Sequence, residues 1–412
     1  MNHFLINMRN WVNGFGSRVL LLSCIMLQAC NNNDLSDLND LVNANQQNVS
    51  TPVQFDLTLT AGEVVPGPVT DNNNEATASV VFDLGTYAMT AQVSTNKLGS
   101  AVLGVQIARG FAGSIGQTVT DLVPSDNPDI WQLPEGFVLA ESDVDLMFRG
   151  GIYLQANTLN HVQGAVRSQV IIGYQELMIN PLSSSQVVGV EVNSSAAGTS
   201  YLTVDTLTGD VHGSIWLTED IVPQQVTLQR GIAGTSGEIL LNYVPDGGTA
   251  GRWVIPQNST LPAATIDEVT SAGSYVQIVT SQYAGGELRG QVYPASYYVD
   301  VVDLSGANLV PQLMTQASGK AYVTLDGFNG NARAIVTLED INPSEVLLVR
   351  INNLNDTTNN KLIYQLEQHD GDWQLPAGSV FNNSDLVNLG NKRLLFVVIS
   401  PDFPLGEIGG WL

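Results

Sequence analysis

Cysteine is nearly absent from this chain of 412 residues, which contains only two copies. Cys24 lies in an apolar stretch near the start, and Cys30 follows the short sequence L-Q-A. After residue 30 no thiol is left to form a disulfide, attack a substrate or bind zinc. The sequence therefore excludes cysteine catalysis and zinc–thiolate centres in the rest of the chain, and it predicts a fold without disulfide bonds.

Positive charge is also scarce. The chain has 15 Lys and Arg residues against 39 Asp and Glu residues, which gives a net charge of −24. A surface of this sign repels the phosphates of nucleic acids and of anionic lipid headgroups. We therefore expect no nucleic-acid partner.

Histidine is rare, and the three copies after the first 30 residues, His161, His212 and His369, lie far apart in the sequence. Metal sites built on imidazole usually gather their ligands on neighbouring strands or on one helix face. We predict no metal site, no cofactor and no catalytic residue. Two turn-like stretches, 71–75 and 326–331, offer oxygen ligands without the spacing of a calcium loop, so calcium dependence stays open.

The chain has no apolar run long enough to cross a bilayer, but its start resembles a secretory signal. Arg9 and Arg18 precede the apolar run 19–27, which is shorter than the roughly 20 residues of a membrane span. A basic region, a short apolar region and a small residue before the break are typical of a signal peptide. We predict this segment to be a lipoprotein signal peptide over 1–29.

The sequence L-Q-A-C that ends this segment resembles the bacterial lipobox. In that resemblance Leu27 and Ala29 are recognised by the signal peptidase, and Cys30 becomes the lipidated first residue. Ordinary secretory cleavage nearby is the alternative. Translation from Met1 or from Met8 would leave a usable basic region in either case, so the start stays open.

Residues 30–53 are dominated by Asn, Asp, Gln and Ser, with too little apolar content to pack. We predict a disordered tether that separates a membrane anchor from the folded part. Asn31 follows the cysteine where an Asp would resemble an inner-membrane retention signal. The expected location is the bacterial outer membrane, on either its periplasmic or its cell-surface face.

The rest of the chain repeats itself. Trp131, Trp253 and Trp373 occur in related W-x-x-P phrases and are separated by 122 and 120 residues. The phrase G-E-L-R-G-Q-V at 286–292 follows the same interval, with looser copies 122 residues earlier and 120 residues later. Landmarks that keep one order and one interval indicate homologous domains in tandem.

Within each interval the pattern is that of β-strands. Segments such as V-Q-F-D-L-T-L-T alternate over four to eight residues between Gly, Asn, Asp and Pro, without a sustained helical period. We predict an all-β protein of three tandem antiparallel β-sandwich or barrel modules, each of about 120 residues. The first repeat covers 54–175, the second 176–295, and the third, more divergent repeat 296–412.

The recurring phrase fits the last strand of each repeat. In 286–292, Leu288 and Val292 fall on one strand face, and Glu287, Arg289 and Gln291 fall on the other. For Glu287 and Arg289 a solvated polar face is the simpler interpretation. On this interpretation the chain stops on the phrase because the third repeat ends there.

These residues resemble the CHRD domain, the module repeated in chordin and common in secreted bacterial proteins. Its closing strands resemble 275–280 and 286–292, and its glycine-rich signature, A-H-I-H-x-G-x-x-G-x-x-G, resembles 105–116 and 226–237. Its opening, an apolar strand followed by G-x-E-V-P-P, resembles 59–66. The resemblance covers about residues 54–412 and implies β-domains exposed outside the cytoplasm.

The chain departs from that family pattern at the histidines. The first two repeats have other residues at each of these positions, namely Gln106, Ala108 and Asn157 in the first and Thr227, Gln229 and Val279 in the second. A metal-binding or acid–base role for those histidines therefore cannot be transferred to this chain.

The three repeated tryptophans are the aromatic candidates for a ligand site. Trp131, Trp253 and Trp373 could each present a ring to a sugar, although a repeated Trp followed by Pro more often fixes a loop to its own core. Asp143 and Asp145 could share a strand face as a pair of acids, but a solvated polar face is the simpler interpretation.

We therefore expect a non-enzymatic, envelope-anchored lipoprotein that binds or scaffolds through CHRD-like domains. Its partners would be the membrane, through the lipid on Cys30, and a protein or polysaccharide ligand that the sequence does not identify. The alternative is an enzyme that acts on envelope carbohydrate through acidic residues.

Overall fold

The computed structural model describes residues 52–66, 74–218, 221–341, 345–353 and 361–412. The predicted signal peptide and nearly all of the tether, with Leu27, Ala29 and Cys30, lie outside the described residues. Within the described ranges, no helix combines the length and the apolar character that crossing a bilayer requires. Residues 54–81 and 88–412 belong to one compact unit, and all contacts between repeats that follow lie inside it.

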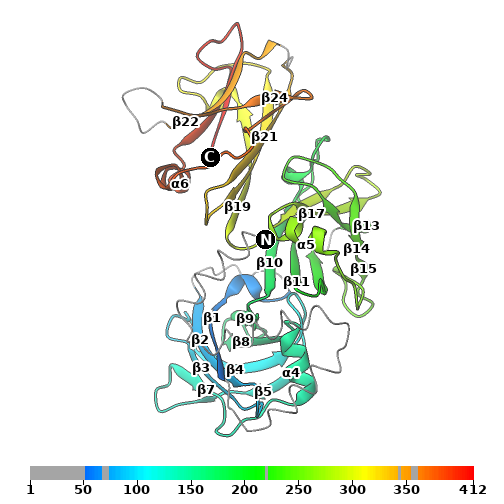
Figure 1. The fold of residues 1–412 in the computed structure, drawn as a ribbon, viewed down its shortest axis with the longest axis vertical. Helices are drawn as coiled ribbons and strands as arrows, with labels where there is room; N and C mark the ends of the chain where they lie inside the picture. Colours follow the sequence, from blue (N-terminus) through cyan, green and yellow to red (C-terminus); the bar gives the residue numbers. More distant parts are fainter. Residues whose placement is uncertain (1–51, 67–73, 219–220, 342–344, 354–360) are drawn as a thin grey trace, which may run out of the picture. The chain divides into compact units, whose positions relative to one another are not determined.

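Each repeat folds into one nine-stranded sheet with a short helix, which confirms the predicted all-β fold of three antiparallel, barrel-like modules (Figure 1). The first sheet has the order β5-β4-β8-β9-β1-β2-β3-β7-β6. Its strands are β1 (Pro52–Thr60), β2 (Glu75–Asp83), β3 (Met89–Ser94), β4 (Val102–Arg109), β5 (Thr118–Asp121), β6 (Val123–Pro124), β7 (Ile130–Gln132), β8 (Ile152–Thr158) and β9 (Val166–Gln169).

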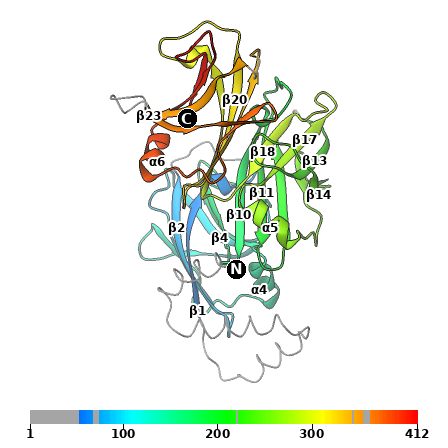
Figure 2. The ribbon, with the colours of Figure 1, turned by 45° about the horizontal axis from the view of Figure 1, so that its top comes forward.

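The second sheet repeats this topology with the order β14-β13-β17-β18-β10-β11-β12-β16-β15. In this sheet β10 pairs with β11 on one side and with β18 on the other, and Figure 2 labels all three strands. The strands are β10 (Gln175–Ser183), β11 (Ala197–Asp205), β12 (Val211–Leu217), β13 (Pro223–Arg230), β14 (Ile239–Asn242), β15 (Val244–Pro245), β16 (Arg252–Val254), β17 (Ser274–Thr280) and β18 (Leu288–Val292).

The third sheet has the matching order β23-β22-β26-β27-β19-β20-β21-β25-β24, despite its divergent sequence. Its strands are β19 (Tyr297–Ser305), β20 (Ser318–Asp326), β21 (Ala332–Glu339), β22 (Leu348–Asn353), β23 (Lys361–Gln365), β24 (Glu367–His369), β25 (Asp372–Gln374), β26 (Leu394–Ile399) and β27 (Ile408–Trp411). A single turn of 3-10 helix follows the first strand of each repeat, as η1 (Ala61–Glu63), η2 (Ser184–Gln186) and η3 (Gly306–Asn308).

The recurring phrase does form the last strand of each repeat, as predicted. Each of these strands lies inside its sheet, between the first strand and the strand that follows the helix: β9 between β8 and β1, β18 between β17 and β10, and β27 between β26 and β19. Close packing limits the side chains that fit there. A Cβ on Gly290 of β18 would approach the Pro181 carbonyl oxygen of β10 to 2.5 Å.

Three short helices correct the sequence analysis. They are α4 (Glu141–Phe148), α5 (Ala263–Thr270) and α6 (Asn383–Gly390), each of eight residues. Asp143 and Asp145, expected on a strand face, lie on α4 instead, two positions apart and therefore on different sides of the helix. Two turns of helix are too short to show a period, although the capping box of Asn382 and Asp385 is present at the start of α6.

The core of each repeat lies on the inner face of its sheet. In β2 buried residues alternate with more exposed ones, as a sheet with one covered face requires. Leu288 and Val292 are fully buried. The solvated face predicted for Arg289 was wrong, because Arg289 is only 2% exposed, and Gln291 on the same face is 1% exposed.

Candidate functional site

The most unusual feature of the first two repeats is a fully buried arginine on the last strand. Arg167 of β9 is 1% exposed, and its carbon Cζ lies 3.5 Å from the centre of the Tyr153 ring on β8. Arg289 of β18 has the same position, again 3.5 Å from the Tyr275 ring. Burial lowers the pKa of both arginines to about 10, so both stay charged at neutral pH.

A buried charge is stable only when its donors are satisfied, and here the satisfying groups are carbonyls of one loop. Arg167 donates to the Ser114 carbonyl at 2.7 Å and to the Phe111 carbonyl at 3.2 Å. Arg289 donates to the Ile232 carbonyl at 3.2 Å. These carbonyls belong to the glycine-rich loops 110–116 and 231–237, which we call the glycine loops.

A glutamine two residues after each arginine completes the arrangement. Gln169 donates to the carbonyls of Gly110, Gly150 and Ile152 at 2.7 to 3.0 Å. Gln291 donates in the same way to the carbonyls of Gly231 and Ala272. We call each set of arginine, tyrosine and glutamine the arginine clamp. It explains why R-x-Q recurs in the phrase: both side chains hold the glycine loop of their own repeat.

The third repeat has lost the clamp and the glycine-loop sequence together. In β8 and β9, Tyr153 lies opposite Gln169, whereas in β26 and β27 Leu395 lies opposite Trp411. Gly409 stands where the arginine would be. In the first two repeats the arginine binds carbonyls of the glycine loop. A repeat without that loop sequence therefore has no such role for an arginine.

The glycine loop of the first repeat contacts the second repeat. Gly113 has a positive φ of 73°, and a Cβ placed on it would lie 2.8 Å from the Tyr201 ring of β11. Tyr201 is fully buried and packs with Val65 and Ala112 of the first repeat. Only a glycine lets the loop backbone reach that ring in this conformation.

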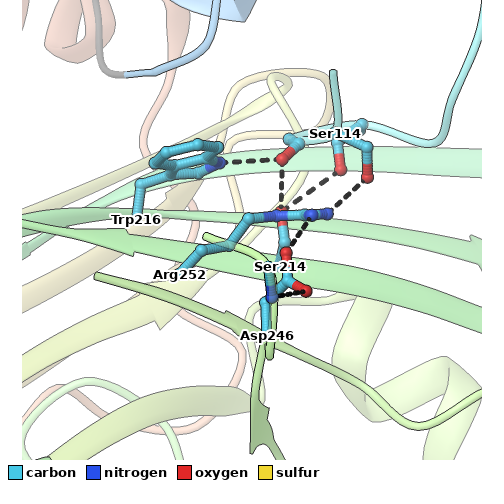
Figure 3. A network of polar contacts seen from close by, with 8 residues as sticks. Ser114, Ser214, Trp216, Asp246 and Arg252 are labelled. Carbon is cyan, nitrogen blue, oxygen red and sulfur yellow. Dashed lines mark hydrogen bonds and ion pairs between the residues drawn. The ribbon is translucent and has the colours of Figure 1, made fainter. Parts of the chain in front are cut away.

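Polar groups fix the same contact (Figure 3). The Gly113 carbonyl accepts hydrogen bonds from Trp216 Nε1 at 2.7 Å and from Ser214 Oγ at 3.0 Å. Arg252 donates to Ser114 Oγ at 2.6 Å and is held by Asp246 at 2.7 Å. The carbonyls of this loop thus accept hydrogen bonds from two repeats. Arg167 of the first repeat binds those of Phe111 and Ser114. Trp216 and Ser214 of the second repeat bind that of Gly113.

An aromatic pair lies beside this network. The rings of Phe111 and His212 stack at 3.6 Å with an angle of 11°. Arg149 Nη2 lies 3.3 Å from His212 Nε2. Burial, reinforced by the positive charge of Arg149, lowers the pKa of His212 to about 4, so the ring is neutral at neutral pH and can accept this hydrogen bond.

The second and third repeats meet in a related way. A Cβ on Gly234, whose φ is 88°, would lie 2.9 Å from the Tyr322 ring of β20. Tyr322 occupies the position of Tyr201. Tyr322 lies opposite Ile335 on the next strand, and Tyr201 lies opposite Ser214, which is the residue equivalent to Ile335. The junctions therefore share a rule: the glycine loop of one repeat packs on a tyrosine of the next.

The predicted ligand-facing tryptophans take part mainly in their own repeats. Trp373 is 7% exposed and belongs to the core of the third repeat, and Trp253 packs against the core of the second. Trp131 is half-buried on β7, next to the edge strand of its sheet, and lies opposite Val93. Their burial favours a role in fixing loops over one in presenting rings to a ligand.

The other candidate residues are dispersed or already engaged. Asp143 is buried and forms a two-pronged ion pair with Arg109, in which Nη2 lies 2.8 Å from Oδ2. Asp326 accepts two hydrogen bonds within its own turn, and the stretch 71–75 falls largely outside the described residues. Over the part of the chain that the structure describes, no three His, Cys, Asp or Glu side chains form a metal-binding group.

Sequence reasoning missed the functional residues of the junction, Tyr201, Trp216 and Arg252. A signal for Tyr201 was present in the sequence. The equivalent stretches 201–206 (Y-L-T-V-D-T) and 322–327 (Y-V-T-L-D-G) begin with tyrosine, whereas the matching stretch of the first repeat begins with Ser79. Only the repeats preceded by another repeat carry that tyrosine.

One prediction concerns Glu63, whose Oε2 accepts from the Gln169 backbone N–H at 2.8 Å near Arg167. Burial raises its pKa from 4.5 to about 7. The folded state thus binds the proton of the Glu63 carboxyl more tightly than the unfolded state does. The stabilisation of the fold by this proton is fully present below pH 4.5 and is lost as the pH rises through about 7. Glu63→Gln should match wild type at pH 4 and be more stable by about 2–3 kcal/mol at pH 8, measured by urea unfolding.

The second repeat shows that this change is compatible with the fold, because Gln186 makes the equivalent bond to the Gln291 backbone at 2.9 Å. Glu75→Gln at an exposed ion pair is the control, with a change below about 0.5 kcal/mol. An equal gain at pH 4 and pH 8 would contradict the assigned titration.

A second prediction concerns the junction. Gly113→Ala should separate the unfolding of the first repeat from that of the second in scanning calorimetry, because the added Cβ collides with the next repeat. Gly136→Ala is the matched control: its φ is also positive, at 76°, but nothing lies within 4 Å of the new Cβ. It should show only the strain, about 1–2 kcal/mol. Identical calorimetric traces for the two variants would rule out a packed junction.

Comparison with known proteins agrees with this architecture. The family model of the CHRD domain matches residues 55–170, 179–292 and 301–412. Neither the curated proteins nor the solved structures gave a match. The three matched ranges cover most of the chain, and each coincides with one nine-stranded sheet except for the first few residues of its opening strand. The chain belongs to the CHRD family and carries three CHRD domains in tandem.

Proposed function

We propose that this protein is a non-enzymatic binding or scaffolding lipoprotein of the bacterial outer membrane, anchored through a lipid on Cys30. Residues 30–53 would act as the tether, and the three CHRD domains would bind an extracellular polymer or another envelope protein. The lipobox-like L-Q-A-C and the polar composition of the tether support the anchor.

The observation that carries the scaffolding role is the junction between repeats. The most sharply defined polar groups of the first two domains, Arg167, Gln169, Arg289 and Gln291, bind backbone carbonyls of their own loops. The glycine loop in turn packs on the next domain through Gly113 and Tyr201. An architecture whose recurring motif holds the loop that joins two domains suits a protein that presents surfaces rather than one that turns over a substrate.

The anchor is tested by Cys30→Ser. The wild-type protein should incorporate labelled fatty acid and sediment with membranes, whereas the variant should be unlabelled and soluble, since the thiol is the only acylation site that the lipobox provides. Cys24→Ser is the control and should behave as wild type. A Cys30→Ser protein that stays labelled and membrane-bound would contradict the proposal.

The choice between binding and hydrolysis is tested with purified envelope polysaccharide and the detergent-solubilised protein. We expect co-sedimentation without new reducing ends over long incubation. Release of reducing ends that disappears in Asp145→Asn, or in another exposed-carboxylate variant, would instead establish the carbohydrate-acting enzyme.

A further inference from the structure

The third repeat, which lacks the arginine clamp, has a groove. The groove has a volume of about 580 Å³ and is lined by β22, β26, the segment 309–313 and the segment 402–406. Its walls are mainly aliphatic, and its rim holds exposed apolar side chains, including Val310 and Leu405, which are 85% and 91% exposed. Apolar surface of this kind in a concave place is typical of a binding site.

The floor of the groove carries polar atoms without partners. Asn352 and Arg350 of β22 both line it, and Asn352 is only 2% exposed. Among the residues that the structure describes, neither Asn352 Oδ1 nor Arg350 Nε has a hydrogen-bond partner, although both atoms are buried. A buried acceptor and a buried donor that are left unpaired both destabilise the folded protein, and a ligand that hydrogen-bonds to them would relieve that cost.

The second repeat shows which group satisfies this position. Leu395 of the third repeat is equivalent to Tyr275 of the second. Asn352 lies opposite Leu395 and Gln229 lies opposite Tyr275, so Asn352 and Gln229 are equivalent too. The Tyr275 hydroxyl donates to Gln229 Oε1 at 2.6 Å and accepts from the Gly237 backbone N–H at 3.2 Å. In the third repeat the tyrosine is a leucine, so the phenol that would satisfy the amide is missing.

We propose that this groove binds a tyrosine side chain of a partner polypeptide. The phenol hydroxyl would donate to Asn352 Oδ1 and accept from Arg350 Nε, and one hydroxyl can do both. The ring would lie against Leu395 and Val397, in space that an arginine and a tyrosine fill in the second repeat. Trp411, 38% exposed at the rim, would provide an edge for aromatic contact.

The size of the groove favours a polypeptide over a free phenol. The volume exceeds what one ring needs, and the exposed rim of Val310, Leu405 and Trp411 offers contacts to the residues on either side of the tyrosine. An aromatic anchor in a central pocket, surrounded by weaker apolar contacts, is the usual pattern of a protein interface hot spot. The proposal rests on the proposed binding role but not on the lipid anchor.

The test uses the full-length protein in detergent and ligand-observed NMR titrations with blocked amino acids. N-acetyltyrosinamide should bind about tenfold more tightly than N-acetylphenylalaninamide, which differs from it only by the hydroxyl. N-acetyl-Leu-Tyr-Leu-amide should bind more tightly than either. Equal affinity for the tyrosine and phenylalanine amides would overturn the proposal, as would p-cresol binding as well as the tripeptide.

Variants assign the effect to the groove. Asn352→Leu should abolish the preference for tyrosine, while Asn352→Asp keeps an acceptor of the same shape and should retain it. Leu395→Tyr should block binding, because the new hydroxyl reaches Asn352 as Tyr275 reaches Gln229. Leu207→Tyr, at a residue of the second repeat that is 66% exposed, is the matched control and should bind as wild type.

Binding that survives Leu395→Tyr, or a tyrosine preference that survives Asn352→Leu, would show that the ligand is held elsewhere and would overturn the proposal. Each variant is checked by its far-UV spectrum and melting curve. The groove proposal and the proposed function can fail separately: absent tyrosine binding leaves fatty-acid labelling at Cys30 and sedimentation with polysaccharide unchanged.

Discussion

The structure depends on a positively charged arginine side chain that is buried in the interior of a domain, where a charge is destabilising unless it is paired. In each of the first two domains one guanidinium is removed from water, placed on a tyrosine face and bound to carbonyls of a loop that has no regular structure of its own. An arginine is suited to this task because its several planar donors can reach carbonyls in different directions at once. Removing it would leave those carbonyls unsatisfied in the interior. The arginine, together with the glutamine two residues later, holds the loop whose backbone contacts the next domain.

The first and third domains each depart from this arrangement. The first domain has Ser79 where the later two have the docking tyrosine, and no domain precedes it within the described residues. The third domain has no arginine on its last strand, where Gly409 stands. Each of these two domains therefore lacks one side of the junction, whereas the second domain has both Tyr201 and Arg289. In the third domain the altered surface is an apolar groove with polar atoms at its floor.

Much of the fold could be predicted from periodicity. The spacing of the tryptophans and of the recurring phrase gave the number of domains, and two-residue alternation gave their β character. The burial of Arg289 and Gln291 could not be predicted, because alternation assigns residues to two faces without saying what covers each face. Nor could α4, α5 and α6, since eight residues contain too few turns to establish a helical period. The junction residues Trp216 and Arg252 differ between repeats, so repetition could not reveal them.

The place of the last strand within each sheet has a consequence for how the chain becomes a protein. β9, β18 and β27 each lie between the first strand of their domain and the strand after the helix, and each pairs with a first strand that lies more than 100 residues earlier in the sequence. A growing chain therefore cannot close a sheet until the final residues of that domain have emerged, and the loop-closure cost falls on the last step. In each domain the seven-residue phrase supplies the strand that completes the sheet. Until it is in place, two strand edges have unpaired backbone donors and acceptors, which can pair with another chain. A tandem of such domains would acquire its structure in order, with each unit sealed before the next is complete.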